Sequence, residues 1–166
     1  MTTEKIWRQA LVIVTVATAA IALSGCSILN QVINTVSDTA DPGPGTTQDV
    51  FSLEIGDCEA GSPAEGEVTE TKVIDCAEPH GAEIYAASYL PDGEFPSAEE
   101  IATQADTDCY AKFESFVGAN WEDSMYDYSW YYPTESSWAD GDREILCLIY
   151  HNDGEQITGS LAGAAK

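Results

Sequence analysis

Between residues 98 and 117, apolar side chains recur at the three- and four-residue spacing of a helix with one buried face. Ser97 precedes this segment and Glu100 follows three residues later, the capping-box pair in which side chains satisfy exposed backbone N–H groups. Gly118 stands where the helix must end. The pattern predicts a helix over residues 98–117, with a buried stripe that comprises Ile101, Ala105, Cys109, Phe113 and Phe116.

Four shorter runs have the composition or the alternation of β-strands, and turn-forming residues separate them. They cover residues 50–55, 72–76, 83–90 and 144–150. In the last run, Ile145, Cys147 and Ile149 alternate onto one side, as expected for a strand that packs against a helix. The chain is therefore predicted to contain an α+β domain, a small antiparallel sheet of short strands with one main helix packed on it.

An aromatic segment lies between the helix and the last strand. Seven aromatic side chains fall within eighteen positions: Trp121, Tyr126, Tyr128, Trp130, Tyr131, Tyr132 and Trp138. Such rings can close the core over the helix, or they can stack on the apolar faces of sugar units while neighbouring acids bind the hydroxyl groups. In the second case we expect Trp130 and Tyr131 to be the exposed pair. The candidate binding residues of this segment are Trp121, Trp130, Tyr131 and Trp138.

The N-terminal segment has the features of an export signal. Lys5 and Arg8 precede an uncharged apolar run over residues 10–23, which leads into Ser24, Gly25 and Cys26. This ending resembles a lipobox, in which small residues admit the processing peptidase and the cysteine thiol takes a diacylglycerol group. The sequence therefore predicts a lipoprotein signal peptide over residues 1–25 and lipid attachment at Cys26.

The alternative for this segment is an uncleaved membrane helix, because residues 10–29 carry no charge and about 20 apolar residues span a bilayer. Lys5 and Arg8 keep the N-terminus inside in either case. Both interpretations place the rest of the chain at the extracytoplasmic face of the cell membrane, and the lipoprotein interpretation makes the membrane a partner through the N-terminal lipid.

The remainder of the chain divides by composition. Residues 26–48, with proline and glycine alternating at 42–45, are predicted to form the lipidated N-terminus and a flexible linker. Residues 49–161 are predicted to form the folded domain, and residues 162–166 a disordered tail.

Cysteine parity agrees with export. When Cys26 is assigned to lipid, an even set remains, namely Cys58, Cys76, Cys109 and Cys147. In an oxidising compartment such a set indicates two disulfides, for which three connectivities are available. We favour Cys58 with Cys76 and Cys109 with Cys147, because pairing of nearest neighbours closes separate loops. Zinc is the competing use of four cysteines, but no C-x-x-C pair occurs.

The charge balance restricts the partners. The whole chain carries 29 acidic residues against six basic ones, for a formal charge of -23. Such a field repels nucleic acid and anionic headgroups, so both are excluded as partners of the folded domain. Cationic partners and divalent ions remain open.

Few residues suggest catalysis. His80 and Glu83 have an H-x-x-E spacing that can present an imidazole and a carboxylate together, although a turn histidine that bonds to the nearby backbone fits the same sequence. Asp140 and Asp142 flank Gly141 and could offer oxygens to calcium. No Ser-His-Asp order, G-x-S-x-G or H-E-x-x-H motif occurs. We predict a protein that is not an enzyme and holds no cofactor or metal.

A series of short motifs carries a family resemblance. It runs from Gly56-Asp57-Cys58 through the stretch Ile74 to Glu83, the helix cysteine Cys109, Tyr132-Pro133 with Trp138, Gly141-Asp142-Arg143 and Cys147, to Gly159-Ser160-Leu161. In this order the motifs resemble the septum formation family of Gram-positive envelope proteins, and the resemblance covers residues 50–161. It implies an extracytoplasmic module associated with cell division or the cell envelope, and it transfers no catalytic residues.

The function expected from these observations is a non-catalytic binding or scaffolding module in envelope or septum assembly. Its expected partners are envelope or division proteins, or peptidoglycan. Two alternatives stay open: a cell-wall hydrolase that uses acidic residues, and a calcium-dependent adhesion or sensing module.

Overall fold

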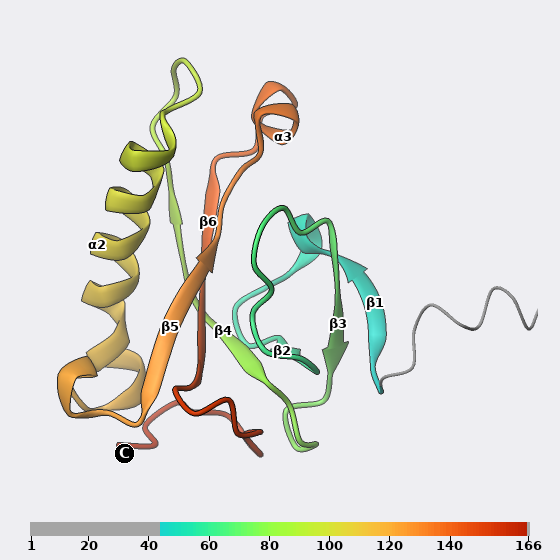
Figure 1. Cartoon of the computed structure of the whole chain (residues 1–166), viewed down its shortest axis with the longest axis vertical. Helices are drawn as coiled ribbons and strands as arrows, with labels where there is room; N and C mark the ends of the chain where they lie inside the picture. The colour runs from blue at the N-terminus through green and yellow to red at the C-terminus, as the bar shows by residue number, and fades with distance from the viewer. Residues whose placement is uncertain (1–43, 166) are drawn as a thin grey trace, which may run out of the picture. The chain divides into compact units, whose positions relative to one another are not determined.

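The computed structural model describes residues 44–165 (Figure 1). The predicted signal peptide, Cys26 and residues 26–43 of the predicted linker lie outside the described residues. In the described part, no helix has both the length and the apolar character that crossing a bilayer requires.

Helix α2 spans Ala98–Val117, as predicted. The Ser97 hydroxyl accepts a hydrogen bond from the Glu100 N–H at 3.3 Å, and the Ser97 N–H donates to the Glu100 carboxylate at 2.9 Å, which completes the capping box. Gly118 ends the helix in the left-handed conformation at φ 85°, which glycine adopts without steric cost. The buried stripe differs from the expected one at a single position, because Val117 is buried and Phe116 only half-buried.

Six strands form one antiparallel sheet in the order β1-β3-β2-β4-β6-β5. Figure 1 shows α2 lying along the face of β4, β6 and β5. The α+β class predicted from the sequence is confirmed. The strands are β1 (Thr46–Asp49), β2 (Cys58–Glu59), β3 (Glu70–Ile74), β4 (Ala82–Tyr89), β5 (Tyr126–Tyr131) and β6 (Glu144–His151), and the short helices are η1 (Val50–Ser52), η2 (Trp121–Asp123) and α3 (Glu135–Ala139).

The strand predicted over residues 50–55 is wrong. Val50–Ser52 forms the 3-10 turn η1, because the Asp49 carboxylate accepts the Phe51 N–H at 2.9 Å and bends the chain there. Val50 and Leu53 are buried and Phe51 is exposed, so the apolar residues follow the three-residue period of a 3-10 turn rather than the alternation of a strand.

Both ends of the predicted domain extend further than composition suggested. Strand β1 pairs Thr46 with Val73 and so begins inside the predicted linker. At the other end, the Gly163 N–H donates to the Phe116 carbonyl at 2.7 Å and the Ala165 N–H to the Val117 carbonyl at 2.8 Å. Residues 162–165 therefore satisfy carbonyl groups at the end of α2 instead of forming a disordered tail.

The two disulfides predicted by nearest pairing are present. Cys109 and Cys147 join α2 to β6, with Cα atoms 5.5 Å apart and both residues fully buried. Cys58 and Cys76 join β2 to the residues that follow β3. The Cys109–Cys147 bond fixes the helix to β6, and the Cys58–Cys76 bond holds β2 to the segment after β3.

Two apolar clusters occupy the two faces of the sheet. The larger one lies under α2 and includes Tyr85, Phe113 and Ile149. The smaller one, on the opposite face, includes Leu53, Ile84 and Leu148. No long helix among the described residues covers this second face. The groove described in the next section lies there.

Removing the Cys109–Cys147 disulfide between α2 and β6 should destabilise the domain strongly. The double substitution Cys109→Ala with Cys147→Ala is expected to lower the free energy of unfolding by about 4 kcal/mol, because the bond closes a 38-residue separation, against about 3 kcal/mol for Cys58→Ala with Cys76→Ala. Urea denaturation followed by tryptophan fluorescence measures both values. A loss below about 1 kcal/mol for the helix–sheet pair would contradict the assigned role.

Candidate binding groove

His80 is a structural histidine. The ring is fully buried, and its Nδ1 lies 2.9 Å from the Glu78 carbonyl oxygen. Its backbone pairs with Ile157 in both directions, at 2.9 and 2.8 Å. This is the turn histidine that bonds to nearby backbone, one of the two interpretations the sequence allowed. The His80 backbone therefore joins the turn before β4 to the C-terminal segment, and its ring holds the turn through Glu78.

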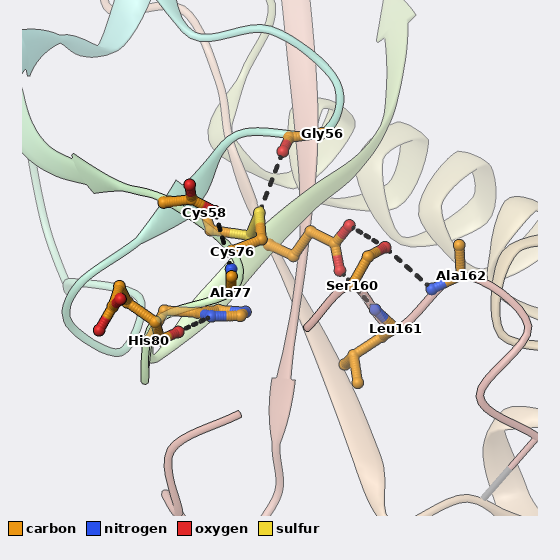
Figure 2. Close-up of a disulfide and its surroundings, with 11 residues drawn as sticks. Gly56, Cys58, Cys76, Ala77, His80, Ser160, Leu161 and Ala162 are labelled. Atoms are coloured by element: carbon orange, nitrogen blue, oxygen red, sulfur yellow. Dashed lines mark hydrogen bonds between the residues drawn. A yellow bond between two sulfur atoms is a disulfide. The ribbon is translucent and has the colours of Figure 1, made fainter. Parts of the chain in front are cut away.

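Glu83 is buried too, and it holds the same segment. One carboxylate oxygen accepts the Ser160 hydroxyl at 2.6 Å and the other accepts the Leu161 N–H at 2.7 Å. Figure 2 shows Ser160 and Leu161 beside the Cys58–Cys76 bond, with the dashed contacts between them and the carboxylate. The side chain is 2% exposed, so it offers no surface to a ligand. His80 and Glu83 therefore secure the chain end through separate partners and do not form an open acid–base pair.

The aromatic segment contains a strand and a short helix that its sequence pattern did not predict. Residues 126–131 form the edge strand β5 and residues 135–139 the short helix α3. Alternation along β5 sends Tyr126, Tyr128 and Trp130 to the α2 side, and Tyr131 to the opposite face. The prediction that Trp130 and Tyr131 form an exposed pair is wrong, because the two side chains lie on opposite faces of the sheet and both are half-buried.

Trp121 and Trp138 have packing partners. The Trp121 indole N–H donates to Asp127 at 3.0 Å, and its ring lies edge-on to Tyr128. Trp138 is buried, and the Arg143 guanidinium lies 3.6 Å from its ring centre. Trp138 thus belongs to the core, whereas Trp121 is 37% exposed and packs at its margin.

A groove of about 550 Å³ opens on the sheet face opposite α2. Tyr131 and Leu146 of the smaller apolar cluster line it, and its walls come from η1, residues 64–68 and residues 129–135. Three aromatic rings at this groove are well exposed: Phe51 at 50%, Tyr132 at 47% and Phe95 at 37%. Trp130 also borders it. These segments are far apart in sequence, so only the fold brings them together.

The charged side chains that line the groove are all acidic. They are Glu65, Glu67, Glu135, Asp142 and Glu144. Asp142 is engaged within the domain, since its carboxylate accepts the Ser137 hydroxyl and the Glu144 N–H, each at 2.9 Å. Glu144 accepts the Tyr89 hydroxyl at 2.9 Å. Glu65, Glu67 and Glu135 are exposed.

A buried carboxylate lies behind the groove and was missed by sequence analysis. Glu59 is 1% exposed, and the Tyr131 hydroxyl donates to both of its oxygens at 3.1 Å. Burial raises the pKa of Glu59 above its ordinary value, and burial next to Glu59 raises the pKa of Tyr131 as well. The pair fixes the Tyr131 ring at the groove, and an acidic loop in the sequence gave no sign that one glutamate would turn inward.

The acidic turn at Asp140 and Asp142 was the candidate calcium site in the sequence. Within residues 44–165, no three His, Cys, Asp or Glu side chains gather closely enough to hold an ion. The Asp142 oxygens make the two hydrogen bonds described above, which close the turn between α3 and β6.

Comparison with known proteins identifies the family. The model of the septum formation family matches residues 55–166. The chain belongs to the septum formation family. The matched region contains both disulfides, His80, Glu83 and every residue that lines the groove except Val50 and Phe51.

Two similar proteins, from Mycobacterium tuberculosis and Mycobacterium bovis, are each named "Putative lipoprotein LppN". Each is 29% identical to this chain over 132 residues, which is 76% of this chain and 71% of the relative. No solved structure gives a significant match. The sequence similarity to these relatives therefore covers most of the chain. The assignment to the family rests on sequence comparison.

The raised pKa of Glu59 predicts a pH dependence of stability. Because its pKa is higher in the folded state, the folded protein binds more protons than the unfolded chain above pH 4.5, so stability falls as the pH rises through the folded pKa. The variant Glu59→Gln has no ionisable group at this position, so its stability does not fall with pH for this reason. The wild type should become progressively less stable relative to Glu59→Gln between pH 4 and 8.

Urea denaturation at several pH values measures this difference. Glu67→Gln is the matched control, since it removes one negative charge at an exposed position. A difference between wild type and Glu59→Gln that does not vary with pH would show that Glu59 ionises as freely in the folded protein as in the unfolded chain.

Proposed function

We propose that this protein is a non-catalytic binding or scaffolding module, anchored by lipid at the outer face of the cytoplasmic membrane, that acts in envelope or septum assembly. The observation that carries the proposal is the groove, where three exposed aromatic rings meet on the face that α2 leaves open. Its partner is an envelope or division protein, or peptidoglycan.

The anchor is supported by three independent features. The sequence that ends at Cys26 resembles a lipobox, and the relatives are named as lipoproteins. The two disulfides suit a compartment in which cysteines oxidise, and the cytosol keeps most thiols reduced.

The proposal of a non-catalytic role is supported by how the buried polar groups are used. Glu83 binds the C-terminal segment, and Glu59 binds Tyr131 without lining the groove. A glycosidase-type site needs one carboxyl group that stays protonated beside the substrate, and burial is the usual means of keeping it so. Glu65, Glu67 and Glu135, which face the groove, are instead exposed.

Lipid attachment is tested by Cys26→Ala. The variant should remain as an unprocessed precursor without lipid, and globomycin should produce the same precursor from the wild type. Mobility on gels and incorporation of labelled palmitate in cells report both effects. A wild type that incorporates no fatty acid, and whose mobility does not change with globomycin, would leave the uncleaved membrane helix as the anchor.

Binding through the groove is tested in living cells with a photo-crosslinking amino acid. Placed at Tyr132 in the groove, it should form a discrete adduct with an envelope component. Placed at Met125, which is 42% exposed and does not line the groove, it should form none. Equal adducts at both positions, or none at Tyr132, would count against the groove as the binding face.

A further inference from the structure

We infer that the groove binds an extended, cationic polypeptide segment that also carries apolar side chains. The inference rests on the proposed binding function and names the chemistry of the partner. It combines three features of the open face: the sign of its charge, its exposed rings and its length.

The lining of the groove carries negative charge. Its charged lining residues are five carboxylates, and no lysine or arginine lines it. Of the basic residues in the described part of the chain, Lys72 lies on β3 and Lys112 on α2. Arg143 lies over Trp138 and pairs with Asp92 at 3.2 Å. A ligand with positive charge would pair with these carboxylates.

The exposed rings add a second requirement. Phe51, Phe95 and Tyr132 leave substantial apolar area in water at the groove, and covering such area contributes about 25 cal/mol per Å². Aromatic faces also attract lysine and arginine cations. Rings beside carboxylates therefore favour cationic side chains that alternate with apolar ones. A neutral sugar could use the carboxylates as hydrogen-bond acceptors, but it would not offset their charge.

The hollow extends beyond the groove. A second depression of about 540 Å³ shares Phe51, Glu144 and Leu146 with it. This depression is lined further along by Ile55 and Tyr89, which are 61% and 69% exposed. The open face thus offers a trough that runs from the Tyr132 side past Phe51 to Tyr89, which suits an extended chain of several residues.

The net charge of the protein supports the same partner. A formal charge of -23 attracts a cationic segment from a distance and raises the rate of encounter, and salt screens this attraction. Binding should therefore weaken as ionic strength rises.

The test uses the full chain in detergent and a fluorescent hexapeptide in which lysine-proline-phenylalanine occurs twice. Proline keeps the probe extended and limits its self-association. One control peptide replaces lysine by glutamate, and another replaces phenylalanine by serine. We expect binding of the first peptide, no binding of the glutamate peptide, and at least tenfold weaker binding of the serine peptide.

Matched variants locate the site. Glu65→Gln, Glu67→Gln and Glu135→Gln together should weaken binding about tenfold, since each exposed pair contributes modestly. The control triple Glu114→Gln, Asp153→Asn and Glu155→Gln removes the same charge from exposed positions that do not line the groove, and should change binding less than twofold.

A second pair of variants tests the rings. Phe51→Ala with Tyr132→Ala should weaken binding of the lysine-phenylalanine peptide at least tenfold, and Met125→Ala should leave it unchanged. All these side chains are exposed, and a circular dichroism spectrum equal to that of the wild type shows that each variant is folded.

The outcomes separate this inference from the proposed function. No binding of the lysine-phenylalanine peptide, equal binding of the glutamate peptide, or equal effects of the two triples overturns the inference. A wall glycan captured by the crosslinker at Tyr132, with no peptide bound, would preserve the binding function and overturn the polypeptide partner.

Discussion

The disulfide between Cys109 and Cys147 is the constraint on which the rest of the structure depends. It joins the buried stripe of α2 to β6, which lies between β4 and β5 in the sheet, and both cysteines are fully buried. With the helix fixed there, one face of the sheet is covered and the other is left to short segments. Residues 64–68 and η1 border that second face without closing it. The groove and its exposed rings follow from this asymmetry.

Two buried glutamates show how an acidic domain uses acidic side chains inside as well as outside. Glu83 holds Ser160 and Leu161, and the last described residues in turn satisfy carbonyl groups of α2. Glu59 fixes the hydroxyl of Tyr131. Both acids therefore position chain segments, whereas Glu65, Glu67 and Glu135 at the groove are exposed. The same residue type thus serves two purposes that burial distinguishes.

Local signals predicted the local elements. The capping box and Gly118 defined α2, and the alternation at Ile145, Cys147 and Ile149 defined β6. The run at 50–55 was misassigned because a single Asp49 side chain bends the chain, and β5 was hidden because aromatic residues fill both of its faces. The groove could not be predicted, since it needs three segments brought together by the sheet order. The disulfide pairing was predicted correctly because the cysteines nearest in sequence lie on elements that pack together, α2 with β6 and β2 with the segment after β3.

Disulfide mapping of the protein isolated from membranes tests this account most directly. Digestion without reduction, followed by mass spectrometry, should yield one peptide pair that joins Cys109 to Cys147 and another that joins Cys58 to Cys76. Recovery of Cys109 joined to Cys58, or of all four cysteines as free thiols, would contradict the helix–sheet staple and with it the open face that the groove occupies.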